Sequence, residues 1–225
     1  MGAGNVQPRR REPTLKKFFM VTPQQPEGML RSQRYTASDN DVLDYDGQTR
    51  FPIVPLISGY TTSGEGVQVI TVTYGAPSNC QNNLTVLRAE LDGLSAAQDL
   101  DIDLVSVDVP FDDSVGALIH TWQLLISHID DGDELYACIT FGSKPVPIML
   151  TMALQYGCRI KRDVSIECVV YGQMDRSQDP PLARIYDVTA LAKLDELVRV
   201  LADMRVAEPE SALRMVLDLG SGENG

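Results

Sequence analysis

Residues 135–147 read Leu-Tyr-Ala-Cys-Ile-Thr-Phe-Gly-Ser-Lys-Pro-Val-Pro, and this stretch decides the fold class. Its first seven residues are mostly apolar, β-branched or aromatic, which is typical of a strand buried on both faces. Gly142 ends the run, and Pro145 and Pro147 suit the first turn of a helix, where a missing N–H group costs little. A buried strand that leads directly into a helix predicts part of a parallel sheet.

The same strand-to-helix pattern recurs along the chain. Apolar runs of strand length end at Gly or Pro, and segments with apolar residues every three or four positions lie between them. This alternation predicts an α/β protein, a Rossmann-like three-layer fold with a mostly parallel central sheet. The expected strands are 18–21, 67–73, 102–109, 135–141, 164–171 and a short one at 183–186, and the expected helices lie around 84–94, 115–129, 148–156 and 191–201.

The folded domain is expected to span residues 16–207. Residues 1–15 are polar and contain prolines and an arginine run, which is typical of a flexible tail. Residues 208–225 begin another amphipathic helix near Pro209 and end in glycines, so they form a linker or a dimerisation helix, or lead to an effector domain beyond this chain. The irregular segment 23–66 is expected to be functional or locally structured, and it carries Arg31, Arg34 and Arg50.

Composition limits the classes of function. A net charge of −12 argues against sequence-independent binding of duplex nucleic acid, which needs a basic surface. A small anionic ligand needs only local amide groups, a helix N-terminus and one or two cations. No apolar run reaches membrane-spanning length and no signal-peptide pattern follows the basic N-terminus, so we expect a cytoplasmic protein with no membrane partner.

Several site types are not expected. The sequence has no phosphate-binding P-loop motif, no dinucleotide fingerprint and no nucleophile elbow, and we expect no cofactor. His120 and His128 lie eight apart in one expected helix without companion ligands, so no metal site is expected either. The four cysteines are interpreted as reduced core residues: Cys80, Cys138, Cys158 and Cys168.

The candidate site lies beyond the carboxyl ends of the strands, where an open parallel sheet gathers its loops. In the loop formed by residues 141–145, Gly142 lets the backbone approach a ligand, Ser143 offers a hydroxyl and Lys144 offers a mobile cation. These residues predict an anion cradle. They equally suit an ordinary helix start, with Ser143 as the cap and Lys144 in solvent. The pair Asp112-Asp113 is typical of a helix start as well.

Four stretches resemble the CRISPR-associated Rossmann-fold (CARF) family of type III CRISPR systems. They are Lys-Phe-Phe-Met-Val-Thr-Pro from Lys17, Asp-Asp-Gly-Asp-Glu-Leu-Tyr-Ala-Cys-Ile-Thr-Phe-Gly-Ser-Lys-Pro-Val-Pro from Asp130, Val-Tyr-Gly-Gln from Val170 and Ile-Tyr-Asp-Val-Thr-Ala-Leu from Ile185. The resemblance implies a homodimer that binds a ring of 3′,5′-linked adenylates, cyclic tetra- or hexa-adenylate, across its two-fold axis. The sequence does not decide the ring size.

The resemblance places Gly142, Ser143 and Lys144 against ring phosphates and riboses, and topology adds the neighbouring loops. The expected ligand-binding residues are Thr22, Pro23, Gln24, Tyr74, Asp112, Gly142, Ser143, Lys144, Pro145 and Gln173. Some family members are ring nucleases that need no metal, and here Lys144, Ser143 and Thr22 are the catalytic candidates. Three hypotheses remain: a sensor, a ring nuclease, and an unrelated Rossmann-like nucleotide-binding protein or DNA-binding regulator.

Overall fold

The architecture comes from a computed structural model, which describes residues 15–26, 28–75, 79–175, 177 and 181–213. Within them, a sheet of seven strands has the order β2-β7-β6-β5-β1-β3-β4. The strands are β1 (Lys16–Val21), β2 (Tyr35–Ala37), β3 (Gly66–Tyr74), β4 (Asp101–Val109), β5 (Glu134–Cys138), β6 (Ser165–Asp175) and β7 (Leu182–Asp187). The helices are α1 (Ile53–Tyr60), α2 (Cys80–Gln98), α3 (Val115–Ile126), α4 (Pro145–Ile160) and α5 (Thr189–Asp203), with a 3-10 turn η1 (Asp41–Leu43).

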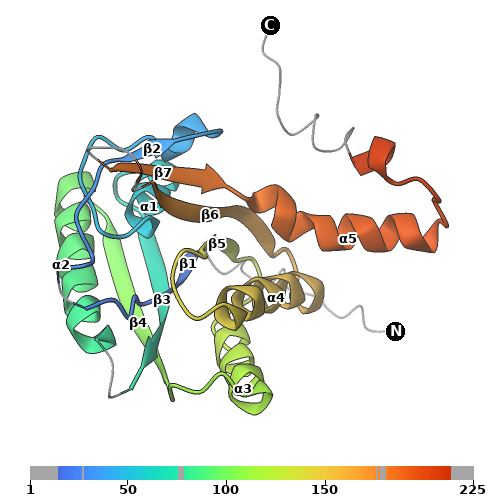
Figure 1. Ribbon diagram of the computed structural model, residues 1–225, viewed down its shortest axis with the longest axis horizontal. Coiled ribbons are helices and arrows are strands. Elements are labelled where there is room, and N and C mark those ends of the chain that lie inside the picture. Colours follow the sequence, from blue (N-terminus) through green and yellow to red (C-terminus); the bar gives the residue numbers. More distant parts are fainter. Residues whose placement is uncertain (1–14, 27, 76–78, 176, 178–180, 214–225) are drawn as a thin grey trace, which may run out of the picture.

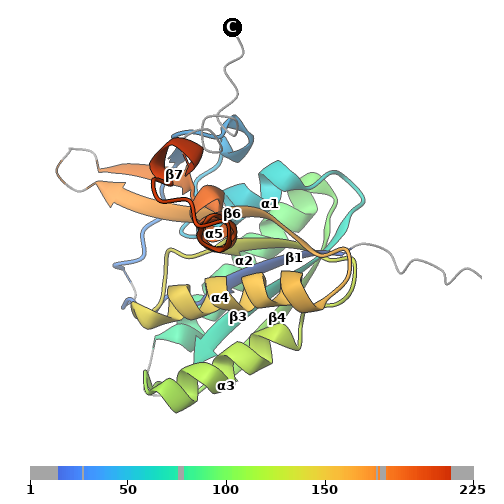
Figure 2. The same cartoon turned by 90° about the vertical axis from the view of Figure 1, so that its right-hand side faces the viewer.

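The sheet lies between two layers of helices. Strands β4, β3, β1, β5 and β6 are parallel, whereas β7 pairs antiparallel with β6 and carries β2 on its other edge. Helices α1 and α2 cover one face and α3 and α4 cover the other, while α5 extends away from the sheet (Figures 1 and 2). The α/β, Rossmann-like three-layer fold with a mostly parallel sheet is therefore confirmed.

The central strand β1 explains why a continuous apolar run was needed. Phe18, Phe19, Met20 and Val21 are at most 1% exposed, because helices cover both faces of the sheet at that position. The ring of Phe18 stacks on Tyr136 of β5 with centroids 4.5 Å apart. At the edge, β4 instead alternates between exposed and partly buried residues, and its exposed positions include aspartates that discourage pairing with another strand.

The strand order reverses at the middle of the sheet. From β1 the chain moves through α1 to β3 on one side, and from β4 it returns through α3 to β5 on the other side of β1. Ligands of open α/β sheets bind outside the carboxyl ends of the strands at such a reversal. The loops after β1 and β5 flank this switch point.

Two strand ends differ from the sequence prediction. Strand β5 ends at Cys138, so residues 139–141, expected in the strand, belong to the loop. Strand β6 continues to Asp175, so its expected end at residue 171 is wrong. Gly172 suggested a strand end, but a Cβ there would lie 2.3 Å from Pro52 Cγ. Gly172 therefore allows close packing against the segment before α1 and does not end the strand. Pairing with β7 extends β6 beyond this glycine.

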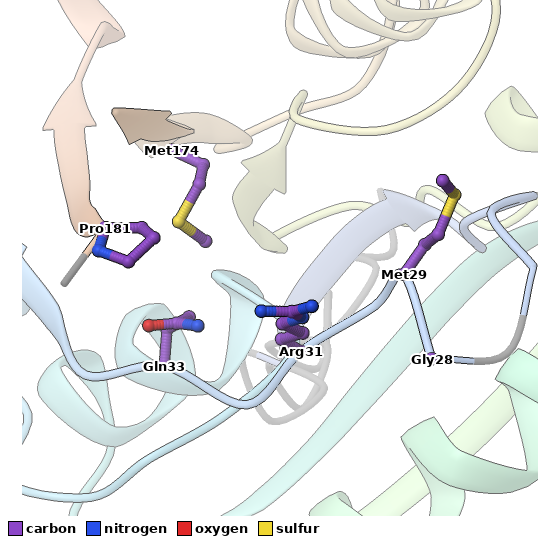
Figure 3. Close-up of a pocket in the computed structure, with 6 residues that line it drawn as sticks. All are labelled: Gly28, Met29, Arg31, Gln33, Met174 and Pro181. Atoms are coloured by element: carbon purple, nitrogen blue, oxygen red, sulfur yellow. The ribbon is translucent and has the colours of Figure 1, made fainter. Parts of the chain in front are cut away.

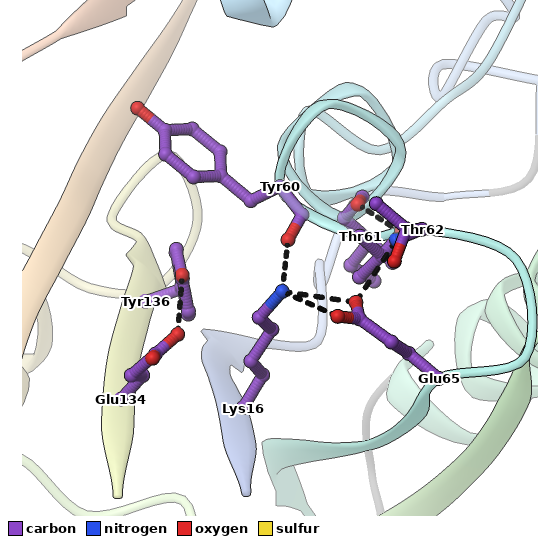
Figure 4. A network of polar contacts seen from close by, with 8 residues as sticks. Lys16, Tyr60, Thr61, Thr62, Glu65, Glu134 and Tyr136 are labelled. Atoms are coloured by element: carbon purple, nitrogen blue, oxygen red, sulfur yellow. Dashed lines mark hydrogen bonds and ion pairs between the residues drawn. The ribbon is translucent and has the colours of Figure 1, made fainter. Parts of the chain in front are cut away.

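The irregular segment 23–66 is locally structured, as predicted. It contains β2, η1 and α1, and residues 51–57 are buried. The Lys16 ammonium donates to the carbonyl of Tyr60 at 2.8 Å and pairs with Glu65 at 2.9 Å, which fastens the end of α1 to the amino end of β1 (Figure 4). Residues 1–14 and 214–225, which include most of the expected tail and terminal helix, lie outside the described residues; residues 210–213 are helical.

The described cysteines are all free thiols, and Cys80, Cys138 and Cys168 are buried, as expected of core residues. None of the helices in the described part of the chain is both long and apolar enough to cross a membrane.

Candidate functional site

Gly142 brings the loops after β5 and β1 together. Its φ of +107° lies in the region that favours glycine, and a Cβ there would lie 3.3 Å from Val21 Cγ1 at the end of β1. A side chain would both strain the backbone and push against Val21. The glycine therefore sets how closely the two loops approach each other at the switch point.

Ser143 does not cap α4. Its hydroxyl donates to Asp113 Oδ1 at 2.6 Å, and the capping position is occupied by Lys144, which makes no side-chain cap hydrogen bond. The interpretation of Ser143 as a plain helix cap is therefore wrong. The contact instead ties the loop after β5 to the loop after β4, two strands that are not neighbours in the sheet.

Tyr74, at the end of β3, lies next to this pair. It is 2% exposed, and its ring meets Phe111 edge-on with centroids 5.5 Å apart. Burial raises the pKa of the Tyr74 hydroxyl. A hydrogen bond with Ser143 lowers this pKa in part, and the Asp113 carboxylate adds a smaller increase. The loops after β3, β4 and β5 thus converge on Ser143.

Lys144 is the cation of the site. It is exposed, and within the described residues no hydrogen bond or ion pair engages its ammonium group. The first turn of α4 offers few amide donors, because Pro145 and Pro147 have no N–H and the Val146 N–H bonds the Ser143 carbonyl at 3.0 Å. An anion at this helix start would depend mainly on the Lys144 ammonium, and binding of an anion by the predicted cradle of Gly142, Ser143 and Lys144 stays a prediction.

The loop after β1 is held from within. The Thr22 hydroxyl is 0% exposed and lies 2.8 Å from the Thr71 hydroxyl, in a chain of buried hydroxyls that continues through Thr73. The Asn83 amide of α2 donates to the Pro23 carbonyl at 2.8 Å. Asn79 and Asn83 also bond the carbonyls of Gln24 and Gln25. These hydrogen bonds fix the loop to β3 and α2, and contact of Thr22 with a ligand or with reacting atoms stays a prediction.

Two further expected residues are placed differently. Asp112 binds Ser114, accepting its backbone N–H at 2.8 Å and its hydroxyl at 2.9 Å, and Ser114 caps α3, so the helix-start interpretation of Asp112 is confirmed. Gln173 lies inside β6, opposite Arg184 of β7, rather than in a loop. A ligand-binding role for either residue stays a prediction.

A cavity of about 260 Å³ lies where residues 28–33 pass the end of β6 (Figure 3). The three arginines of the irregular segment differ in their surroundings. Arg34 pairs with Asp46 and Arg50 pairs with Glu90, whereas Arg31 lines the cavity. The sequence did not predict this cavity, because its walls come from distant segments, although arginines in so acidic a chain were a signal. Its lining is Gly28, Met29, Arg31, Gln33, Met174 and Pro181.

In the part of the chain that the structure describes, no group of three or more His, Cys, Asp or Glu side chains is arranged to hold a metal ion. His120 is exposed and His128 is half-buried. Burial, and then the nearby Lys17 ammonium, lowers the pKa of His128.

The fold and the converging loops define a Rossmann-like α/β protein with a candidate ligand site at the switch point of its sheet. No family model matches the chain. A stretch of 75 residues is 27% identical to a CRISPR-associated protein of Methanocaldococcus jannaschii; it covers 33% of this chain and 12% of that protein. The chain therefore has a distant similarity to a CRISPR-associated protein and spans only a small part of its length.

Proposed function

We propose that this chain is a sensor domain of a type III CRISPR response, of the CARF kind, that binds cyclic tetra- or hexa-adenylate at a homodimer interface. The observation that carries the proposal is the loop Gly142-Ser143-Lys144 at the switch point, whose ammonium pairs with none of the described residues, in a chain of net charge −12. The distant similarity to a CRISPR-associated protein supports a CRISPR-related role, and the motif resemblance supports the choice of ligand.

Exposed apolar residues on α3 and α4 support the homodimer. They follow one another at a spacing of four, so each set forms a stripe along its helix, and the two helices pack side by side. Both helices start at the carboxyl edge of the sheet. Pairing of two protomers along these helices would bring two Lys144 loops near one axis, where a symmetric ring can meet both. The stripes are Val115 and Ile119 on α3, and Ile148, Met152, Tyr156 and Ile160 on α4.

The test is a calorimetric titration with cyclic tetra-adenylate, cyclic hexa-adenylate, ATP and NAD. We expect one of the rings to bind and Lys144→Ala to weaken that binding by about 1.5–3 kcal/mol, because a charge-assisted phosphate contact is lost. Lys161→Ala is the matched control, since Lys161 lies just past the opposite end of α4. Full affinity in Lys144→Ala would show that the site is misplaced, and tighter binding of ATP or NAD would favour an ordinary nucleotide-binding protein.

Ring cleavage is the second candidate at the same site. It needs no metal, because a 2′-hydroxyl of the ring can attack the adjacent phosphate in line while the protein stabilises developing charge. Lys144 is the exposed cation that stands beside a site hydroxyl, that of Ser143. Incubation with the ring and analysis for linear or 2′,3′-cyclic-phosphate products tests it, and unchanged ring would exclude it.

A further inference from the structure

We propose that Asp113 is the specificity-determining residue of this site: together with Ser143 it accepts a hydrogen bond from a ribose 2′-hydroxyl and so selects riboadenylate over deoxyriboadenylate rings. The inference rests on the proposed function and concerns which sugar that site accepts. It starts from the contact between the Ser143 hydroxyl and Asp113 Oδ1, 2.6 Å long, which joins two loops across the carboxyl edge of the sheet.

The direction of this hydrogen bond decides what Ser143 can recognise. A serine hydroxyl has one proton, and here Ser143 donates it in the hydrogen bond to the carboxylate of Asp113. Toward any other partner Ser143 can therefore only accept, and because it also hydrogen-bonds the Tyr74 hydroxyl, one lone pair remains for a ligand. A phosphodiester oxygen carries no proton to donate, whereas a sugar hydroxyl does. Asp113 itself accepts no other hydrogen bond from the described residues, so Oδ2 is a second acceptor for the same hydroxyl.

Charge leads to the same assignment. An ionised carboxylate repels a phosphate, so the Asp113–Ser143 pair is a poor place for the anionic part of the ligand. Lys144, the next residue, carries the opposite charge and has no partner in the described residues. The site therefore separates into a sugar-binding pair and a phosphate-binding ammonium at adjacent positions of one loop.

Neighbouring side chains hold the pair in place. Tyr74, 2% exposed, lies beside Ser143, and Phe111 covers its ring. On the other side, the start of α3 is fixed by Asp112 and Ser114, so Asp113 is not needed as the cap. Replacing Asp113 should therefore change recognition without unravelling α3.

The experiment compares the affinity of the full chain for a 3′,5′-linked riboadenylate ring with its affinity for the deoxyriboadenylate ring of the same size. In the wild type we expect the ribo ring to bind more tightly by about 10- to 100-fold for each protomer that contacts it, as for loss of one hydrogen bond to a charged group per protomer. In Asp113→Ala this ratio should fall to about threefold or less, and Ser143→Ala should lower it as well. Asp103→Ala, which removes an equal charge from the amino half of β4, is the control and should keep the wild-type ratio.

The ratio removes a complication, because loss of a carboxylate strengthens binding of any anion and so affects both rings equally. Circular dichroism melting of each variant checks that the fold is intact. If the wild type prefers the ribo ring and Asp113→Ala keeps the full ratio, the inference is overturned while the proposed function stands. The same holds if the wild type binds both rings equally. If neither ring binds, the proposed function fails and this inference fails with it.

Discussion

Met152→Glu is the substitution that most directly tests the α3–α4 surface as a dimer interface. Met152 is 57% exposed in the single chain. Fully burying such a side chain stabilises by about 1.5–3 kcal/mol, so burying the exposed part contributes about 1–2 kcal/mol. A two-fold interface contains the residue twice, which doubles this to about 2–4 kcal/mol, and glutamate adds carboxylates that would be desolvated.

We therefore expect the dimer dissociation constant to rise by at least about 100-fold in Met152→Glu, because about 2.7 kcal/mol corresponds to that factor. Sedimentation velocity over a dilution series measures it. Val42→Glu is the control: Val42 is 48% exposed on η1, which packs with α1 on the opposite face of the sheet. At protein concentrations where the wild type is monomeric, the melting temperature should change little in either variant, since Met152 and Val42 are 57% and 48% exposed in the single chain.

Ring binding gives the second measurement. If each protomer contributes half of the site, Met152→Glu should weaken ring binding at protein concentrations below its new dissociation constant, although Met152 need not touch the ring. A variant that dimerises like the wild type would refute the assignment of this surface. A wild-type chain that stays monomeric yet binds the ring with a stoichiometry of one would refute the shared site.

Two further predictions concern the amino end of the sheet. Lys17→Met should lower the free energy of unfolding by about 3–5 kcal/mol in a denaturant titration, because it leaves the buried Asp133 carboxylate without its cation. Lys16→Met is the control: it breaks the partly exposed pair with Glu65 and should lower the free energy of unfolding by about 1 kcal/mol. Equal losses in the two variants would contradict this reasoning. The hydrogen bond from Lys17 lowers the pKa of Asp130 from its usual value of 3.8, so the ionised Asp130 stabilises the fold above that pH, and this stabilisation is lost as the pH falls through the lowered pKa. The decrease in the free energy of unfolding on acidification should therefore be smaller in Lys17→Met, as measured by denaturant titrations at several pH values.

The fold could be predicted because its signals are local. Each buried parallel strand is a short apolar run and each covering helix has its own periodicity, so the element types around residues 135–147 followed from neighbouring residues alone. The errors arose where a distant segment decides the outcome. Gly172 is a glycine because Pro52 packs against it, and β6 extends to Asp175 because β7 pairs with it.

The site was predictable as a place but not as a set of contacts. The Gly142 loop could be placed at the carboxyl edge because it follows a strand expected to lie in a parallel sheet. The engagement of Ser143 by Asp113 depends on two loops whose strands are not neighbours, and no spacing in the sequence encodes it. The cavity at Arg31 depends in the same way on segments that meet only in the fold.

The charges at the loop would allow so acidic a protein to bind a polyanion, as the proposed function requires. The hydroxyl of Thr22 is hydrogen-bonded inside the protein and the prolines of α4 remove amide donors, so among the described residues at this helix start Lys144 and the Ser143–Asp113 pair remain to meet a ligand. An oligonucleotide ring alternates neutral riboses with anionic phosphates. An ammonium next to a carboxylate-bound hydroxyl matches that alternation, whereas inorganic phosphate would gain the ammonium and also meet the carboxylate. In the proposed site, the Asp113 carboxylate that accepts from the sugar would also repel simple anions, so selectivity for the ring would come with only modest affinity for phosphate itself.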